Sequence, residues 1–141
     1  FANDLVKMCG IRAHFLVAMT SLITAYGNDE AWSRMFSAAL EIFLKPNDVV
    51  IAISCSGNSP NVVSAVQSAI DFGKPAALVK TIALIGADLD CALAKLNPNV
   101  LIGVPFRDIK VQEDCHMVIC HAIAGALKLE HDKHEHESET V

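Results

Sequence analysis

N-D-V-V-I-A-I-S-C-S-G-N-S-P-N-V-V-S-A-V-Q-S-A-I-D-F, residues 47–72, is the stretch that decides the fold. Residues 49–53 form a continuous apolar run behind turn-forming residues, which is typical of a strand buried on both faces of a parallel sheet. Pro60 stands where a helix would begin, and Asn58 or Ser59 is placed to cap it. Apolar residues then recur at helical spacing to the end of the stretch. The pattern predicts a strand, a turn and a helix in succession.

The turn between this strand and this helix is rich in small hydroxyl residues. Ser54, Ser56 and Ser59 surround Gly57. Free backbone N–H groups, the positive end of the helix and several hydroxyl donors would converge there, which suits a bound anion. Serine and glycine also fill ordinary strand-to-helix turns, so composition alone would leave both interpretations open. Their placement between a buried strand and an amphipathic helix favours the anion site.

Composition indicates one α/β domain and excludes some partners. The chain has 141 residues, of which 52% are hydrophobic and 19% charged, enough to bury a sizeable core. The net charge of −5 and the scattered basic residues argue against direct binding of nucleic acid. No run approaches the roughly 18 apolar residues of a membrane span, so we expect no membrane association. The five cysteines include no CxxC pair and are expected to be reduced thiols of a cytoplasmic protein.

Outside the central stretch, predicted strands and helices alternate along the chain. Further strands are expected at 14–18, 81–85 and 100–104, and helices at 1–9, 21–26, from the Asn28-Asp29 cap to 43, at 87–96 and at 111–129. Such alternation predicts right-handed crossovers onto a parallel sheet. The connection at 74–80 is longer than usual and has no functional interpretation. Residues 130–141 lack apolar periodicity and are expected to form a flexible polar tail, in preference to a loose metal site at its three histidines.

The last predicted helix carries two chemically suggestive side chains. Glu113 and His121 are eight residues apart, so they lie on one helix face two turns apart. A carboxylate and an imidazole aligned in this way can share a proton-transfer task or a divalent metal. The spacing alone is also compatible with a surface glutamate and a partly buried, hydrogen-bonded histidine, and both interpretations stay open at this point.

Three segments resemble one known family. I-S-C-S-G-N-S-P-N-V is similar to the phosphate loop of SIS (sugar isomerase) domains, particularly those of the phosphoheptose isomerase family. F-A-N-D-L-V at the start resembles the family's H-F-A-x-E-L-V, and Gly27-Asn28-Asp29 resembles its G-N-D. The resemblance covers residues 1–129. It implies a three-layer α/β/α sandwich with a central parallel sheet, flavodoxin-like in topology, whose first strand and glycine-rich turn lie outside this sequence.

The resemblance also implies which residues bind the substrate. Ser54, Ser56 and Ser59 would hold a phosphate, and Cys55 would contribute its backbone. Asp29 matches the aspartate that contacts sugar hydroxyls in the family. The expected ligand is therefore a phosphorylated sugar.

Catalytic and metal-ligating residues follow from the two terminal helices. Asp4 stands at the family's catalytic glutamate, one methylene shorter, and His121 matches the family's histidine, which puts Glu113 at the position of a glutamine. Another register would keep Gln112 as the glutamine but place Cys120 at the histidine, and we prefer the first because it retains the base. In zinc-bearing members the catalytic glutamate is a ligand. If zinc is present here, Asp4, Glu113 and His121 are its best ligands, because carboxylate oxygen and imidazole nitrogen both suit it.

Three classes of function are compatible with these residues. The resemblance implies aldose–ketose isomerisation of sedoheptulose 7-phosphate through an enediol, supplying heptose for surface polysaccharide, by a homotetramer with shared active sites. The alternative is a non-catalytic SIS-domain regulator that binds a sugar phosphate, such as a protein that associates with the replication initiator. A third class is a purely structural oligomerisation domain. The substitutions at Asp4 and Glu113 favour the regulator, and His121 favours the enzyme.

Overall fold

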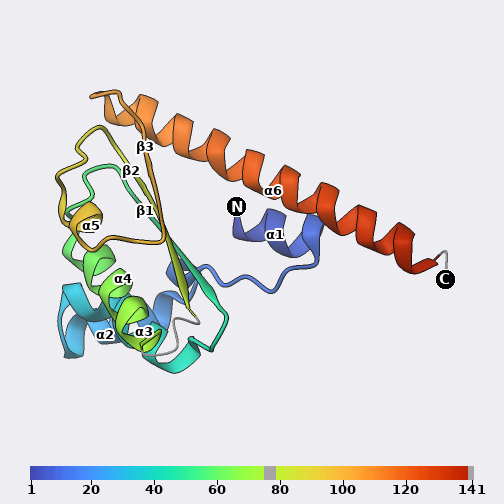
Figure 1. Cartoon of the computed structure of the whole chain (residues 1–141). Helices are drawn as coiled ribbons and strands as arrows, with labels where there is room; N and C mark the ends of the chain where they lie inside the picture. The colour runs from blue at the N-terminus through green and yellow to red at the C-terminus, as the bar shows by residue number, and fades with distance from the viewer. Residues whose placement is uncertain (75–78, 140–141) are drawn as a thin grey trace. The chain divides into compact units, whose positions relative to one another are not determined.

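The computed structural model describes residues 1–74 and 79–139, with side chains as far as residue 133 (Figure 1). The helices are α1 (Ala2–Cys9), α2 (Thr20–Asp29), α3 (Met35–Phe43), α4 (Pro60–Phe72), α5 (Ala92–Lys95) and α6 (Ile109–Glu139); the strands are β1 (Val49–Ser54), β2 (Lys80–Ile85) and β3 (Val100–Gly103); and two 3-10 helices cover Leu16–Ala18 and Trp32–Arg34. The chain divides into two compact units. One is Leu16–Glu113, and the other combines Phe1–Phe15 with the chain from Asp114 onward.

The larger unit is built on a parallel sheet with the strand order β1-β2-β3. Ala52 of β1 pairs with Ala83 of β2, which pairs with Leu101 of β3. Helices α4 and α5 contact the sheet, and α3 packs against α4 (Figure 1). Between the sheet and these helices lies a core whose buried members are Ala52, Val66, Ile85, Cys91 and Leu93. The parallel α/β fold that the alternating pattern predicts is therefore confirmed.

The central stretch folds as its sequence predicts. The strand β1 ends at Ser54, one residue later than expected, and α4 begins at Pro60 with Ser59 as the residue before it. Of the two capping candidates, Ser59 therefore occupies the N-cap position. The helix stops at Gly73, as expected. The predicted order of strand, turn and helix is confirmed.

Three predictions for elements outside the central stretch are wrong. The helix α2 runs through Gly27 to Asp29 with Glu30 as its C-cap, so Asn28-Asp29 caps no helix. The helix expected from there to residue 43 begins only at Met35, after the 3-10 helix Trp32–Arg34.

The strand expected at 14–18 does not form, and Leu16–Ala18 within it is a 3-10 turn instead. A strand is stable only when a neighbour pairs with its backbone, and the sheet in the described part of the chain contains β1, β2 and β3 alone. The helix expected at 87–96 shortens to α5, because the Asp88 Oδ1 accepts the Asp90 N–H at 2.9 Å and holds a turn there.

The last helix is longer than expected at both ends. It begins at Ile109 because the Asp108 carboxylate caps it, with Oδ1 accepting the Lys110 N–H at 2.9 Å. It continues to Glu139, so the predicted end at residue 129 is wrong, and ion pairs one turn apart support the extension (Lys128–Asp132 and Lys133–Glu130, both 2.6 Å). Flexibility of residues 130–141 stays a prediction. Residues 75–78 of the long connection and 140–141 lie outside the described residues.

The smaller unit pairs the first helix with the last. Leu5 and Cys9 of α1 are buried, and the Cys9 thiol donates to the carbonyl oxygen of Ala124 in α6 at 3.3 Å. Gly10 ends α1 in the left-handed conformation, with φ of 62°, as the sequence predicts for this position. The place where a Gly10 Cβ would stand is 3.5 Å from His131 Nε2. The hydrogen bond of Cys9 thus joins α1 to α6.

Two further findings concern the whole described chain. In the part of the chain that the structure describes, no helix is both long enough and apolar enough to cross a membrane. None of the five cysteines forms a disulfide in the structure, and their redox state stays a prediction.

Candidate functional site

The serine loop, residues 54–59, is closed by the hydroxyl and the carbonyl of Ser54. The Gly57 N–H donates to the Ser54 carbonyl oxygen at 3.0 Å and lies 3.2 Å from its Oγ. The Ser54 hydroxyl also donates to Ser59 Oγ at 3.4 Å. Ser56 is exposed at the tip of the loop, and its Oγ accepts the Asn58 N–H at 3.2 Å. The structure therefore brings the three predicted phosphate-binding serines onto one tight turn at the N-terminus of α4.

Asn58 anchors the loop to a second helix. Its Oδ1 accepts the Ala92 N–H at the start of α5 at 2.8 Å, and its Nδ2 donates to the Ser56 carbonyl oxygen at 3.0 Å. One residue earlier, the Gly57 carbonyl oxygen accepts the Leu93 N–H at 2.9 Å. Sequence reasoning offered Asn58 only as a possible helix cap. Its link to α5 joins residues 34 apart in the sequence, and local spacing carries no signal of it.

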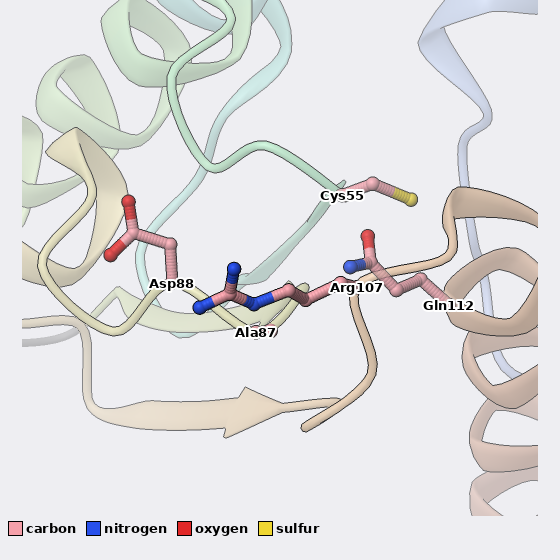
Figure 2. Close-up of a pocket in the computed structure, with 5 residues that line it drawn as sticks. All are labelled: Cys55, Ala87, Asp88, Arg107 and Gln112. Atoms are coloured by element: carbon pink, nitrogen blue, oxygen red, sulfur yellow. The ribbon is translucent and has the colours of Figure 1, made fainter.

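A cavity of about 470 Å³ opens beside the loop, lined by Cys55, Ala87, Asp88, Arg107 and Gln112 (Figure 2). These residues follow the carboxyl ends of β1, β2 and β3, where ligands bind in open parallel sheets. Only Cys55 was among the predicted site residues. Asp88 and Arg107 could have been found by noting which polar residues follow each predicted strand, and Gln112 entered the sequence analysis only through the alternative register.

The Cys55 side chain lines this cavity, although the sequence predicted a role for its backbone alone. Its carbonyl oxygen accepts the Gly86 N–H at 2.9 Å, which ties the loop to the end of β2. Burial raises the pKa of the Cys55 thiol, and the negative charge of Glu113 raises it further. The thiol is therefore protonated and neutral at pH 7. Glu113 is exposed, close enough to the loop to act on its electrostatics.

Gln112 is the buried polar residue of the cavity wall, only 5% exposed. Its Nε2 donates to the Phe106 carbonyl oxygen at 2.5 Å, which fixes the orientation of the amide. Its Oε1 is buried and has no hydrogen-bond partner among the described residues. The amide thus leaves one acceptor unused in the wall of the cavity.

The two predicted proton-transfer groups meet within the smaller unit. His121 Nε2 lies 3.9 Å from Asp4 Oδ2, which also lies 3.6 Å from the amino group of Phe1. The His121 side chain is 63% exposed and that of Asp4 is 31% exposed, so solvent and a ligand can reach both. A carboxylate and an imidazole at this separation can each contact a third molecule. Their catalytic roles stay predictions.

The other predicted residues are placed less directly. Within the described residues, no group of three or more His, Cys, Asp or Glu side chains is arranged to hold a metal ion. Zinc binding by Asp4, Glu113 and His121 stays a prediction. Asp29 is the exposed last residue of α2, which packs against α3, and its contact with sugar hydroxyls stays a prediction.

Comparisons with known proteins agree on one family. No family model matches the chain. Phosphoheptose isomerases from Trichlorobacter lovleyi and Helicobacter pylori are 35% and 34% identical to it, over 91% and 84% of this chain. The solved structure of phosphoheptose isomerase from Neisseria gonorrhoeae is 30% identical and matches with a TM-score of 0.76, covering 89% of this chain and 67% of that one. A phosphoheptose isomerase from Francisella tularensis, 25% identical, also matches with a TM-score of 0.76, over 90% of this chain and 69% of that one.

The chain belongs to the phosphoheptose isomerase family. The family that the sequence predicts is thereby confirmed. The chain spans 64% of the length of the T. lovleyi protein and 58% of the H. pylori protein.

Replacement of Gly57 tests the geometry of the loop. Its φ is +63°, and a Cβ there would meet the Sγ of Cys91 and, at 2.8 Å, its Cβ. We expect Gly57→Ala to lower the free energy of unfolding by about 1–2 kcal/mol for the left-handed backbone, with the overlap adding to this. Urea unfolding followed by circular dichroism measures the change.

Gly27→Ala is the matched control. Gly27 lies within α2, and nothing stands within 4 Å of its Cβ position, so alanine should stabilise the protein by up to about 1 kcal/mol. Equal stability of the Gly57→Ala variant and the wild type would contradict the loop geometry.

Proposed function

We propose that the protein interconverts sedoheptulose 7-phosphate and an aldose heptose 7-phosphate through an enediol. The observation that carries the proposal is the 3.9 Å approach of the Asp4 carboxylate to the His121 imidazole, from helices at opposite ends of the chain. The family of the chain and its serine loop support the same reaction. Sugar isomerisation needs such a pair, because one group must move a proton between carbons and another between oxygens.

In this scheme the serine loop holds the phosphate. Ser54, Ser56 and Ser59 supply hydroxyl donors at the positive end of α4, a helix of 13 residues. The phosphate is remote from the reacting carbons, so the energy of its binding serves to position the sugar. Asp29 would contact the sugar hydroxyls.

Asp4 and His121 transfer the protons in this scheme. The Asp4 carboxylate takes a proton from C1 of the ketose, the C1–H electron pair forms the C1=C2 bond, and O2 takes a proton from the imidazolium of His121. The enediol then loses its O1 proton to His121 while the Asp4 carboxyl returns its proton to C2, which leaves a C1 aldehyde. Both groups end in their starting forms. Asp4 is shorter than the family's glutamate by one C–C bond, about 1.5 Å, so we expect the reaction to be slow.

The remaining assignments extend the same proposal. Glu113 acts beside the catalytic pair, the protein works in the cytoplasm, and its product feeds heptose synthesis. Zinc held by Asp4, Glu113 and His121 stays a prediction from the family, and the scheme above does not use it.

Removal of a loop hydroxyl tests the phosphate site. We expect Ser56→Ala to weaken binding of sedoheptulose 7-phosphate about threefold to tenfold, the value of one lost hydrogen bond. Binding of unphosphorylated sedoheptulose should be weak and unchanged by the substitution. Titration calorimetry compares the two ligands, with Ser21→Ala, an exposed serine of α2, as the control. Equal affinity of the wild type for both ligands would refute the phosphate assignment.

Substitution of the catalytic pair tests the reaction. We expect weak isomerase activity in the wild type, a loss of about 100-fold or more in His121→Ala, and a gain in Asp4→Glu, because general acid–base catalysis contributes about 10²–10⁴-fold. NMR detection of the aldose product measures the rates, and the exposed His14 supplies the control His14→Ala. Full activity in His121→Ala would show that the match of the last helix to the family's helix is wrong, and would favour the alternative match at Gln112 and Cys120. Binding of the sugar phosphate without activity in any variant would favour the regulator.

A homotetramer with shared active sites is the expected assembly. The apolar side chains available for an interface on α6 are Val118, Ile119, Ile123 and Leu127, and Val118 is 66% exposed. We expect light scattering at micromolar concentration to give the mass of a tetramer, and Val118→Asp to give a smaller species because it buries a charge. The control is Lys110→Asp, at an exposed position of the same helix. A wild-type chain that stays monomeric would contradict the assembly.

A further inference from the structure

The cavity beside the serine loop contains an arginine that forms no ion pair with any of the described residues. Arg107 lines the cavity together with Cys55 of the loop. Figure 2 shows its side chain extending across the cavity in the direction of Asp88. In the described part of the chain Arg107 forms no ion pair, whereas Arg34 binds two carboxylates, Glu30 at 3.1 Å and Glu41 at 2.7 Å. The positive charge of Arg107 is thus available to a ligand.

The serine loop itself supplies no cationic side chain. Residues 54–59 offer hydroxyls, backbone N–H groups and a neutral Cys55 thiol. A phosphate monoester carries nearly two negative charges at pH 7. The protein carries a net charge of −5, so its overall field does not attract such an anion. A guanidinium beside the loop would provide the missing positive charge, with planar donors that match phosphate oxygens.

Backbone contacts hold Arg107 in this place. The preceding residue is bound on both sides, since the Phe106 N–H donates to the Val104 carbonyl oxygen at 2.8 Å and its own carbonyl accepts from Gln112 Nε2. The following residue, Asp108, accepts the Gln112 N–H at 3.0 Å and caps α6. The guanidinium therefore extends from a fixed segment at the end of β3.

We propose that Arg107 binds the phosphoryl group of the ligand held by the serine loop, and that it provides the charge neutralisation that the loop lacks. This inference rests on the proposed function for the identity of the ligand, but its anion chemistry can be tested without it. Asp88 lies on the same cavity and its carboxylate opposes the bound anion. The two charges should therefore change anion affinity in opposite directions.

Binding of inorganic phosphate to the full chain is the direct test. We expect Arg107→Gln to raise the Kd for phosphate about tenfold or more at 0.05 M salt, because a hydrogen bond to a charged group contributes about 1.5–3 kcal/mol, and 1.4 kcal/mol is tenfold. Arg107→Lys should recover part of the affinity. Asp88→Asn should lower the Kd about twofold to fivefold by removing a nearby negative charge.

A matched control separates local binding from general electrostatics. Lys110→Gln removes the same charge three residues away, at an exposed position that does not line the cavity. We expect its Kd for phosphate to change less than twofold at 0.15 M salt, where the Debye length is about 8 Å. Arg107 is exposed, so its substitution should leave the circular dichroism spectrum unchanged.

The outcomes distinguish this inference from the proposed reaction. A wild type that does not bind phosphate, or an Arg107→Gln variant that binds it as tightly as the wild type, would overturn the inference. If the wild type isomerises sedoheptulose 7-phosphate and Arg107→Gln keeps its KM, the reaction stands and the inference fails. If phosphate binding depends on Arg107 but no isomerase activity appears, the inference stands and the proposed reaction fails. A raised KM of Arg107→Gln for sedoheptulose 7-phosphate, with kcat little changed, would support both the inference and the proposed reaction.

Discussion

The close approach of the serine loop to the end of β2 is the contact on which the larger unit depends. The Gly86 N–H donates to the Cys55 carbonyl oxygen, and a Cβ on Gly86 would collide with that oxygen and with Gln112, whose Cδ would be 2.6 Å away. Two segments that follow neighbouring strands can meet this closely only because no side chain separates them. The cavity, the loop and the start of α6 share this contact, so a change at Gly86 would disturb all three together.

Electrostatics at this edge of the sheet is set by a few groups. Burial, and after it the charge of Glu113, raises the pKa of the Cys55 thiol, so the neutral thiol adds no repulsion against an anion. The positive end of α4 favours a bound anion. On the cavity wall, the positive charge of Arg107 and the negative charge of Asp88 act on such an anion in opposite directions. A site of this kind gains its selectivity from the balance of fixed charges, because the hydroxyls of the loop would hydrogen-bond many ligands.

Periodicity and turn chemistry predicted the parts of the fold that depend on local sequence. The strand β1, the start of α4 at Pro60 and the end of α1 at Gly10 follow from apolar runs, proline and glycine. Two of the errors arise from a strand-like segment that finds no neighbour in the sheet and from a carboxylate cap that apolar spacing does not reveal. Residues 14–18 have the composition of a strand but no neighbour in the described sheet, and Asp108 caps α6 ahead of its apolar pattern. The family resemblance located the serine loop and the pair Asp4 and His121, but Arg107, Asp88 and Gln112 lie near Cys55 through folding alone.

The pairing of α1 with α6 has a consequence for the order of folding. The Cys9–Ala124 hydrogen bond joins residues 115 apart, and α1 has only 8 residues. A helix this short is marginal in water by itself, so α1 stays unstable until α6 provides a surface for Leu5 and Cys9. During synthesis on the ribosome, residues 2–9 must therefore wait until the α6 segment has been made. Asp4 reaches His121 only after that segment has left the ribosome, and a nascent chain that ends just after the folded serine loop still lacks this pair.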